Sequence, residues 1–216
     1  MIFQLDDKLW FPDPRLGEED GLFAVGGDLS PERLILAYHY GIFPWFSFRN
    51  HDEPLWYCPM KRFVIFPSEI HVSHSMRTLM NKGEYTCTFN KAFHDVIIGC
   101  GIANNRFLQD GAWLGEDIIK AYGKLHELNV AASVEVWEGK RLVGGLYGVV
   151  INDCFIGESM FSLVPNASKL ALIHLARFMQ EKGKGIIDCQ FETPHLKSMG
   201  GRFIDYDDYL RFLHEK

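Results

Sequence analysis

The sequence lacks three features that mark particular classes of protein. Its 216 residues contain no apolar run near the roughly 20 residues that span a bilayer, and its first residues carry acids where a secretory signal carries bases. Its five cysteines form no CxxC pair and are odd in number, which argues against a zinc ribbon or a disulfide framework. We therefore expect a cytoplasmic protein with reduced thiols and no membrane contact.

The sequence also lacks the basic excess of a general nucleic-acid binder. Its formal net charge is −6, whereas contacts with many phosphates favour a basic surface. Basic residues outnumber acidic ones only in the segment 61–110. In that segment, Lys61, Arg62, Arg77 and Lys82 are candidates for a local phosphate-binding patch, although charge counts alone favour an ordinary solvated surface.

The N-terminal part of the chain predicts one helix followed by an irregular aromatic segment. Ser30 can cap the helix, Pro31 suits its first turn, and Gly41 can end it. The segment 42–63 is crowded with aromatic residues and interrupted by prolines. We therefore expect neither a regular helix nor a central strand in that segment.

The pattern becomes more regular after residue 65, which predicts a small N-terminal α+β domain (1–65) and a larger domain (66–216). The elements expected in the larger domain are a helix over 115–128, strands over 133–137, 141–151 and 154–159, a helix over 166–182 and a last strand over 185–190. The first three strands predict an antiparallel meander. The strand–helix–strand unit that follows predicts two parallel neighbours, because such crossovers are nearly always right-handed. The fold class is therefore expected to be mixed α+β.

Polar side chains stand late in two of the predicted strands. Because side chains alternate along a strand, Glu158 shares a face with Ile156, and Asp188 shares a face with Gln190. Ligands in open α/β sheets tend to bind outside the carboxyl ends of parallel strands. Glu158, Asp188 and Gln190 therefore form a candidate active site. A structural role, such as capping a helix or pairing with a base, fits their spacing equally well.

The order of the predicted elements is that of the acyltransferase core shared by many N-acetyltransferases, and it suggests group transfer. In that core, a glycine-rich turn at the helix start usually binds the pyrophosphate of coenzyme A. The corresponding turn here reads FSLVPNASK and contains no glycine. We therefore expect another activated acyl carrier in place of coenzyme A.

Several motifs resemble those of the leucyl/phenylalanyl-tRNA protein transferases over almost the whole chain. In order, they are GGDLSPERLILAYHYGIFPWFS, LVGGLYGV, GESMFS, NASK and DCQ. The resemblance implies an N-acetyltransferase-like (GNAT-like) C-terminal domain behind a small N-terminal domain. It implies Leu-tRNA or Phe-tRNA, less often Met-tRNA, as donor and proteins beginning with Lys or Arg as acceptors. It also implies that the product is marked for N-end-rule degradation, and that no cofactor or metal takes part.

The resemblance assigns the binding of the donor to named residues. Trp45 in FPWFS and Trp113 in GAWLGE would hold the terminal adenosine of the tRNA by stacking, although each tryptophan alone would be an ordinary core residue. The donor side chain would enter an apolar pocket that selects it by shape. The residues carried over for that pocket are Leu146, Leu172, Leu175, Met179 and Ile187. The family often has methionine in place of Leu146 and phenylalanine near Leu175 and Met179, which leaves the preference between Leu and Phe open.

The chemical step requires a proton acceptor, because an α-amino group with a pKa of about 8 is mostly protonated at neutral pH. Asp188 and Gln190 resemble the catalytic pair of the family, in which one residue polarises or deprotonates the amine and the other positions it. Glu158 would lie near the aminoacyl group or attract the cationic acceptor. The family often has Trp-Ser-Pro-Asp-Pro-Arg where this chain has WYCPMKR, which keeps Arg62 and loses the acid.

The residues leave three alternatives open. A coenzyme A-dependent N-acyltransferase would share the core, and a cell-wall aminoacyl transferase would share the donor but is expected to contain duplicated cores. A non-catalytic reader of tRNA ends or basic N-termini would use the two tryptophans without turnover. A metal site is not expected, because the spacing of His71 and His74 lacks a third ligand. We expect the protein to be a monomer.

Overall fold

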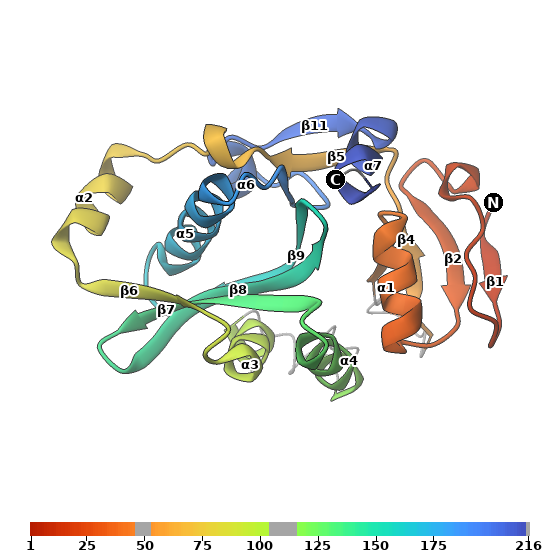
Figure 1. The fold of residues 1–216 in the computed structure, drawn as a ribbon, viewed down its shortest axis with the longest axis horizontal. Coiled ribbons are helices and arrows are strands. Elements are labelled where there is room, and N and C mark those ends of the chain that lie inside the picture. The colour runs from red at the N-terminus through yellow and green to blue at the C-terminus, as the bar shows by residue number, and fades with distance from the viewer. Residues whose placement is uncertain (46–52, 104–115, 215–216) are drawn as a thin grey trace.

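The computed structural model describes residues 1–45, 53–103 and 116–214, which two mixed β-sheets organise (Figure 1). The smaller sheet belongs to the N-terminal part of the chain. Its strands, in spatial order, are β1 (Phe3–Leu5), β2 (Leu22–Gly26), β4 (Leu55–Tyr57) and β3 (Phe43–Trp45). β1 and β2 run parallel, whereas the other two pairs are antiparallel. A short 3-10 helix, η1 (Pro14–Leu16), lies between β1 and β2 in the chain.

Helix α1 (Pro31–His39) forms where the sequence predicts it. The Ser30 hydroxyl accepts a hydrogen bond from the backbone N–H of Arg33, and Pro31 occupies the first turn. Gly41 has a φ of 70°, a left-handed conformation that glycine adopts without a steric penalty. These two ends fix the helix so that Tyr38, near its carboxyl end, is fully buried.

The aromatic segment 42–63 contains strands that the sequence analysis excluded. β4 lies between β2 and β3, so it is a central strand of the smaller sheet. The prediction was wrong because Pro54 and Pro59 flank the three residues of β4 and leave their N–H groups free to pair. Pro44 lies in β3, which is an edge strand of this sheet and tolerates a missing donor.

The larger sheet carries the elements around the candidate site. Its strands, in spatial order, are β11 (Arg202–Asp205), β5 (Lys61–Ile65), β10 (Ile186–Asp188), β9 (Cys154–Ser162), β8 (Arg141–Ile151), β7 (Ala131–Glu138) and β6 (Tyr85–Phe89). β10 runs parallel to β9, and every other neighbouring pair is antiparallel.

Helices cover both faces of the larger sheet (Figure 1). α5 (Ala167–Glu181) packs on one face, against β7, β8 and β9. α3 (Phe93–Ala103) and α4 (Glu116–Glu127) pack on the opposite face, and α1 contacts α4 there. Each side has its own hydrophobic cluster, one with Leu172, Leu175 and Ala176 of α5 and the other with Tyr38 and Tyr122.

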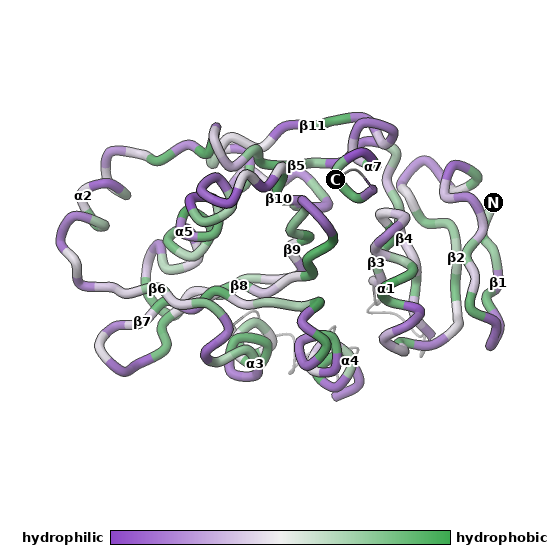
Figure 2. Tube along the Cα trace, in the orientation of Figure 1, coloured by the Kyte–Doolittle hydropathy of each residue, from purple (hydrophilic) through white to green (hydrophobic). Residues whose placement is uncertain are grey.

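The remaining elements lie around the margins of the larger sheet. They are η2 (Pro67–Glu69), α2 (His74–Lys82), α6 (Pro194–Ser198) and α7 (Tyr206–His214). α2 lies at the end of the molecule opposite the smaller sheet and is largely hydrophilic, whereas β8 and α3 are largely hydrophobic (Figure 2). α7 packs against β5 and β11.

The structure confirms the predicted meander, because β7, β8 and β9 pair in sequence as antiparallel neighbours. It also confirms that β10 follows α5 and lies parallel to β9. The prediction of a last strand over 185–190 was wrong in two respects. The strand ends at Asp188, because Gln190 has a φ of 62°, and β11 follows it in the chain.

The two mixed sheets and their covering helices confirm the α+β class. The division into domains 1–65 and 66–216 stays a prediction. β5 lies inside the segment 1–65 but is hydrogen-bonded to β10 and β11, so it is part of the larger sheet.

Candidate functional site

The chain turns sharply at the carboxyl end of β10, and a side chain of the strand stabilises the turn. The backbone N–H of Gln190 donates to Oδ1 of Asp188 at 2.8 Å, which is a local turn typical of aspartate. Gln190 itself is left-handed, a rare conformation for a residue other than glycine. Such backbone positions concentrate at functional sites, where the surrounding structure has to hold them.

The other oxygen of Asp188 is held by a buried cation. Oδ2 lies 3.0 Å from Nε of Arg62 and accepts a hydrogen bond from the hydroxyl of Tyr209 at 2.7 Å. The Arg62 guanidinium lies between the rings of Phe43 and Tyr209, at 4.8 and 4.6 Å from their centroids, and also donates to the carbonyl of Gly41. Both charged side chains are buried, so Asp188 is a neutralised, hydrogen-bonded anchor beneath the turn.

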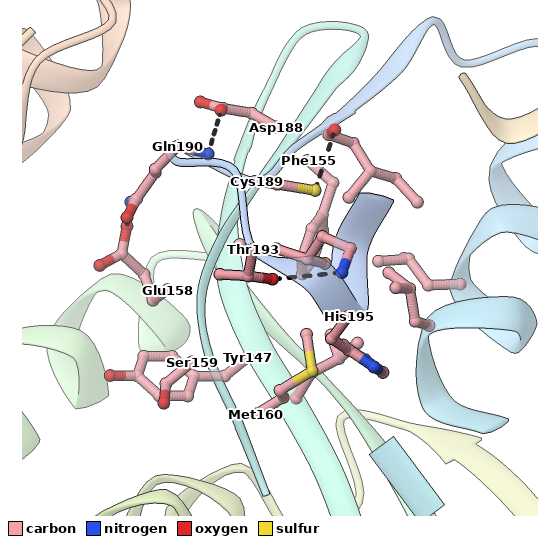
Figure 3. Close-up of a pocket in the computed structure, with 16 residues that line it drawn as sticks. Tyr147, Phe155, Glu158, Ser159, Met160, Asp188, Cys189, Gln190, Thr193 and His195 are labelled. Carbon is pink, nitrogen blue, oxygen red and sulfur yellow. Dashed lines mark hydrogen bonds between the residues drawn. The ribbon is translucent and has the colours of Figure 1, made fainter. Parts of the chain in front are cut away.

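Glu158 stands opposite the turn, on β9. The register of β8 and β9 shifts beside it, between the pairs Tyr147–Ser159 and Gly148–Gly157. Nε2 of Gln190 lies 3.1 Å from Oε1 of Glu158, and the two side chains point toward each other (Figure 3). The pair therefore joins the ends of the two parallel strands.

Two tyrosines complete the surroundings of Glu158. The hydroxyl of Tyr38 lies 2.8 Å from Oε1, and the hydroxyl of Tyr122 lies 2.9 Å from Oε2. Burial raises the pKa of Glu158 to about 7, even though hydrogen bonds from both tyrosines favour its ionised form. Glu158 can therefore exchange a proton near neutral pH.

A cavity of about 320 Å³ opens beside this cluster (Figure 3). One end carries Glu158 and Gln190, and the remainder is mainly apolar. Its apolar lining comes from β8, β9, α5, β10 and α6 and consists of Leu146, Phe155, Met160, Leu172, Leu175, Ile187 and Leu196. The volume suits a small ligand with one apolar side chain.

Trp45 lies close to the same turn. Its ring packs edge-on against Phe191, which directly follows Gln190, with the ring centroids 5.1 Å apart. Trp45 is half-buried and also contacts Phe43 and Tyr57. An aromatic surface, an apolar cavity and a group that titrates near pH 7 thus meet at the end of β10.

Comparison with known proteins shows the family to which the chain belongs. A family model described as leucyl/phenylalanyl-tRNA protein transferase matches residues 64–214, and a model of the N-terminal domain of the same family matches residues 27–60. The chain belongs to the leucyl/phenylalanyl-tRNA protein transferase family. It is therefore a transferase.

Curated relatives of this transferase are similar over most of their length. The leucyl/phenylalanyl-tRNA–protein transferase of Desulforapulum autotrophicum is 47% identical over 99% of this chain and 92% of its own. That of Flavobacterium psychrophilum is 48% identical over 97% and 98%, and that of Flavobacterium johnsoniae is 45% identical over 100% of both chains. Among solved structures, a conserved protein of unknown function from Bacteroides thetaiotaomicron is similar with a TM-score of 0.48 and 14% identity, over 81% of this chain and 62% of that one.

The structure brings together most of the residues that the sequence selected for the transferase site. Leu146, Leu172, Leu175 and Ile187 line the cavity together with Glu158, Asp188 and Gln190. Met179 does not, because it lies one turn farther along α5 and lines a second cavity of about 160 Å³. Trp113 lies outside the described residues.

The expected phosphate patch does not form a single surface. Arg62 is 1% exposed and paired with Asp188, so it cannot face a phosphate. Lys61 begins β5, whereas Arg77 and Lys82 lie on α2 at the far end of the molecule (Figure 1). The side chains of Lys61, Arg77 and Lys82 are all exposed.

Sequence reasoning missed several residues of the site. Tyr38 and Tyr122 were passed over as helix residues, although a buried tyrosine hydroxyl normally requires a partner and so points to a polar site. Phe155, Met160 and Leu196 line the cavity but have no signal beyond hydrophobicity. His195 also lines it, and its buried Nε2 has no hydrogen-bond partner in the described part of the chain.

No group of three His, Cys, Asp or Glu side chains in the described ranges is arranged to hold a metal ion. No helix in these ranges is long and apolar enough to cross a bilayer.

Proposed function

We propose that this transferase moves a leucyl or phenylalanyl group, less often methionyl, from aminoacyl-tRNA to the α-amino group of a protein that begins with Lys or Arg. The reaction forms a peptide bond, releases the tRNA and marks the acceptor for N-end-rule degradation. The observation that carries the proposal is the apolar cavity with Glu158 and Gln190 at one end. The donor ester is already activated, so the reaction requires no cofactor.

The cavity supports the choice of donor. Its volume of about 320 Å³ accommodates a leucyl or phenylalanyl side chain, and its apolar lining offers such a side chain no hydrogen bond. Selection would then rest on shape, which separates apolar side chains only weakly and fits a donor set of several amino acids. Trp45, beside the turn, is positioned to stack on the terminal adenosine of the tRNA. Trp113 is proposed for the same role from the family resemblance.

The geometry also supports a division of roles at the turn. Both oxygens of Asp188 are occupied, by Arg62 and Tyr209 on one side and by the Gln190 N–H on the other. We therefore assign Asp188 a positioning role, in which it holds Gln190 in its left-handed conformation. Gln190 and Glu158 border the cavity and are the groups assigned to contact the reacting amine and ester.

The element order supports an N-acetyltransferase-like core for the larger domain. The antiparallel β7–β8–β9 meander, the crossover α5 and the parallel strand β10 follow one another as in that core. The turn before α5 begins the helix at Asn166 and contains no glycine, which disfavours coenzyme A as the donor. A division of the domains near residue 60 is proposed because β5 pairs within the larger sheet.

A transfer assay tests the proposal. Purified protein is mixed with radiolabelled Leu-tRNA or Phe-tRNA and a peptide that begins with Arg, and the label in the peptide is counted. We expect transfer to this peptide, and none to the same peptide with an acetylated N-terminus. Gln190→Ala should lower kcat by about 100-fold, the scale of a lost acid–base or positioning group. Glu192→Gln, an exposed neighbour of the turn, is the matched control and should leave transfer unchanged.

Two outcomes would overturn the proposal. Binding of aminoacyl-tRNA without transfer from either donor would favour a non-catalytic reader of tRNA ends. Equal transfer by the native protein and Gln190→Ala would show that the turn takes no part in the reaction. Asp188→Asn is a further variant for the positioning role of Asp188, because asparagine keeps a hydrogen-bond acceptor for the Gln190 N–H.

A further inference from the structure

Three oxygen contacts close a ring around Glu158. The hydroxyl oxygen of Tyr38 lies 2.8 Å from Oε1, that of Tyr122 lies 2.9 Å from Oε2, and the two tyrosine oxygens lie 2.5 Å apart. The three residues come from α1, α4 and β9, and all are buried. The two contacts with Glu158 have the length of ordinary O–H···O hydrogen bonds, and the contact between the tyrosines is a short one. The ring therefore contains three hydrogen bonds.

Three such bonds require three protons. Each tyrosine hydroxyl supplies one, and neither gives it up at neutral pH, because burial raises the pKa of Tyr38 and of Tyr122 well above the ordinary value. An ionised Glu158 has no proton to add, so one of the three contacts would bring two oxygen lone pairs together. A protonated Glu158 supplies the missing proton.

We propose that Glu158 carries a proton in the resting enzyme and shares it with Tyr38 and Tyr122 in a closed ring of three hydrogen bonds. The ring runs in one direction. Oε2–H of Glu158 donates to the Tyr122 oxygen, Tyr122 donates to Tyr38, and Tyr38 donates to Oε1. Tyr38 and Tyr122 are then positioning residues for acyl transfer, and in that respect the inference rests on the proposed function.

The hydrogen bond from Gln190 agrees with this direction. Nε2 of Gln190 donates to Oε1, the same oxygen that accepts from Tyr38. In the proposed ring, Oε1 is the carbonyl oxygen and accepts from both Tyr38 and Gln190, whereas Oε2 is the hydroxyl and donates to Tyr122. The ring thus fixes the amide of Gln190 with its nitrogen toward Glu158, which leaves the amide oxygen to accept an N–H of the incoming amine.

The charges near Glu158 do not supply a reason for it to ionise. The titratable and charged groups that face it, or its ring partners, are Tyr38 of α1, Tyr122 of α4, Tyr147 of β8, Asp188 of β10 and Arg62 of β5. Asp188 opposes the ionisation of Glu158 and Arg62 favours it, and these two neutralise each other at 3.0 Å. Burial is the largest influence on Glu158 and raises its pKa to about 7, whereas hydrogen bonds donated by Tyr38 and Tyr122 to the carboxylate lower it. The site therefore presents a neutral acid to the acceptor instead of a second carboxylate.

The direct test is a titration of Glu158 by carbon-13 NMR, with labelled glutamate side chains in the full chain. Glu158→Gln assigns the resonance, because it removes one carboxyl signal. We expect the native protein to show Glu158 protonated at pH 6 and titrating near the value of about 7. A Glu158 resonance that is already ionised at pH 6 would overturn the proposal.

Two variants test whether the ring holds the proton. Tyr38→Phe and Tyr122→Phe each break the ring, so each should lower the titration midpoint of Glu158 by about one unit, a tenfold change in its ionisation equilibrium. If the tyrosines served only as donors to a carboxylate, their loss would raise the midpoint, and that result contradicts the ring. Tyr206→Phe is the matched control, since Tyr206 is also buried and its hydroxyl donates to the carbonyl of Tyr40, outside the ring.

The titration tests the hydrogen-bonded ring and the transfer assay tests the proposed function, so a negative result in one does not imply a negative result in the other. If the inference is correct and the proposed function is correct, Tyr38→Phe and Tyr122→Phe also shift the alkaline side of the pH profile of kcat to lower pH, whereas Tyr206→Phe does not. A midpoint near 7 in a protein that transfers nothing would contradict the proposed function and leave the ring intact. An unshifted pH profile in variants whose Glu158 midpoint has fallen would refute the positioning role.

Discussion

Nε of Arg62 lies 3.0 Å from Oδ2 of Asp188, and this buried ion pair anchors the turn that carries Gln190. Asp188 reaches the turn through Oδ1 and the cation through Oδ2, so one carboxylate connects β5, β10 and α7. A buried pair of this kind contributes modestly to stability as a whole. The loss of one partner, however, leaves the other charge buried in the interior without compensation. Arg62 is thus a structural support of the site.

The first prediction concerns this pair. Arg62→Met should lower the free energy of unfolding by about 3–5 kcal/mol, because it leaves Asp188 buried without its cation. Urea unfolding measures the change. The matched control is Arg141→Met, which removes an exposed arginine paired with Glu138 and should cost less than about 1 kcal/mol. Equal losses in the two variants would contradict the anchoring role.

The second prediction concerns the size of the cavity proposed to bind the donor side chain. Leu175 and Phe155 line both the main cavity and the second cavity behind it. Leu175→Ala should join the two volumes and raise the ratio of kcat/KM for Phe-tRNA over Leu-tRNA by about 10-fold, the scale of a small change in an apolar pocket. Met179→Ala is the control, because Met179 lines only the second cavity. A larger change in the ratio from Met179→Ala would show that the family assignment of Met179 was right.

Local pattern was sufficient to predict the framework of the site. The period of two in β7 and β8, the turns at Gly139 and Asn152, and the apolar stripe of α5 are all read within short windows of sequence. They place Glu158 and Asp188 near the ends of neighbouring parallel strands. The same windows extended β10 two residues too far at its carboxyl end, because the left-handed turn at Gln190 depends on the side chain of Asp188.

Partners that are distant in the chain could not be predicted in this way. Tyr38 and Glu158 are 120 residues apart and meet only because α1 packs against α4 and β8. Arg62 was assigned to a phosphate-binding patch because basic residues outnumber acidic ones in its segment, whereas its partner Asp188 lies on another strand. Pairing between polar groups that are distant in the chain produces no periodic pattern in the sequence. These contacts can therefore be identified only from the folded structure.

The third prediction concerns Trp45. Trp45→Ala should raise KM for aminoacyl-tRNA by roughly 10- to 100-fold, which corresponds to the loss of one base–aromatic stack, with a smaller effect on kcat. Trp45→Phe should retain most of the binding, since it keeps a ring. Steady-state kinetics with Leu-tRNA measures both. Trp10→Ala removes an exposed tryptophan of the N-terminal segment and controls for general effects. A fall in kcat alone for Trp45→Ala would exclude a binding role.

The fourth prediction concerns Arg77 and Lys82, which lie exposed on α2. If they contact tRNA phosphates, reversal of both charges should reduce the slope of log K against log salt concentration by about 2, one unit for each lost contact. Binding of uncharged tRNA at several salt concentrations measures the slope. Reversal of Lys140 in the β7–β8 turn and of Arg141 at the start of β8 is the charge-matched control. An unchanged slope for the α2 variant would show that this helix does not contact tRNA.

The last prediction follows from the titration of Glu158. Its pKa is raised from an ordinary value of 4.5 to about 7 in the folded protein, so the folded state binds the proton more tightly than the unfolded state. The contribution of Glu158 to stability is therefore fully present below pH 4.5 and is lost as the pH rises through 7. Relative to Glu158→Gln, which cannot ionise, the native protein should lose roughly 3 kcal/mol across this interval.

Urea unfolding of both proteins at several pH values measures this difference, and Glu192→Gln controls for the removal of an exposed carboxyl group. Because glutamine keeps one donor and one acceptor, Glu158→Gln can close the ring with Tyr38 and Tyr122 as the protonated acid does. The variant should therefore match the native protein at low pH and exceed its stability at high pH. A difference that stays constant with pH would mean that Glu158 binds its proton equally tightly in the folded and unfolded chains.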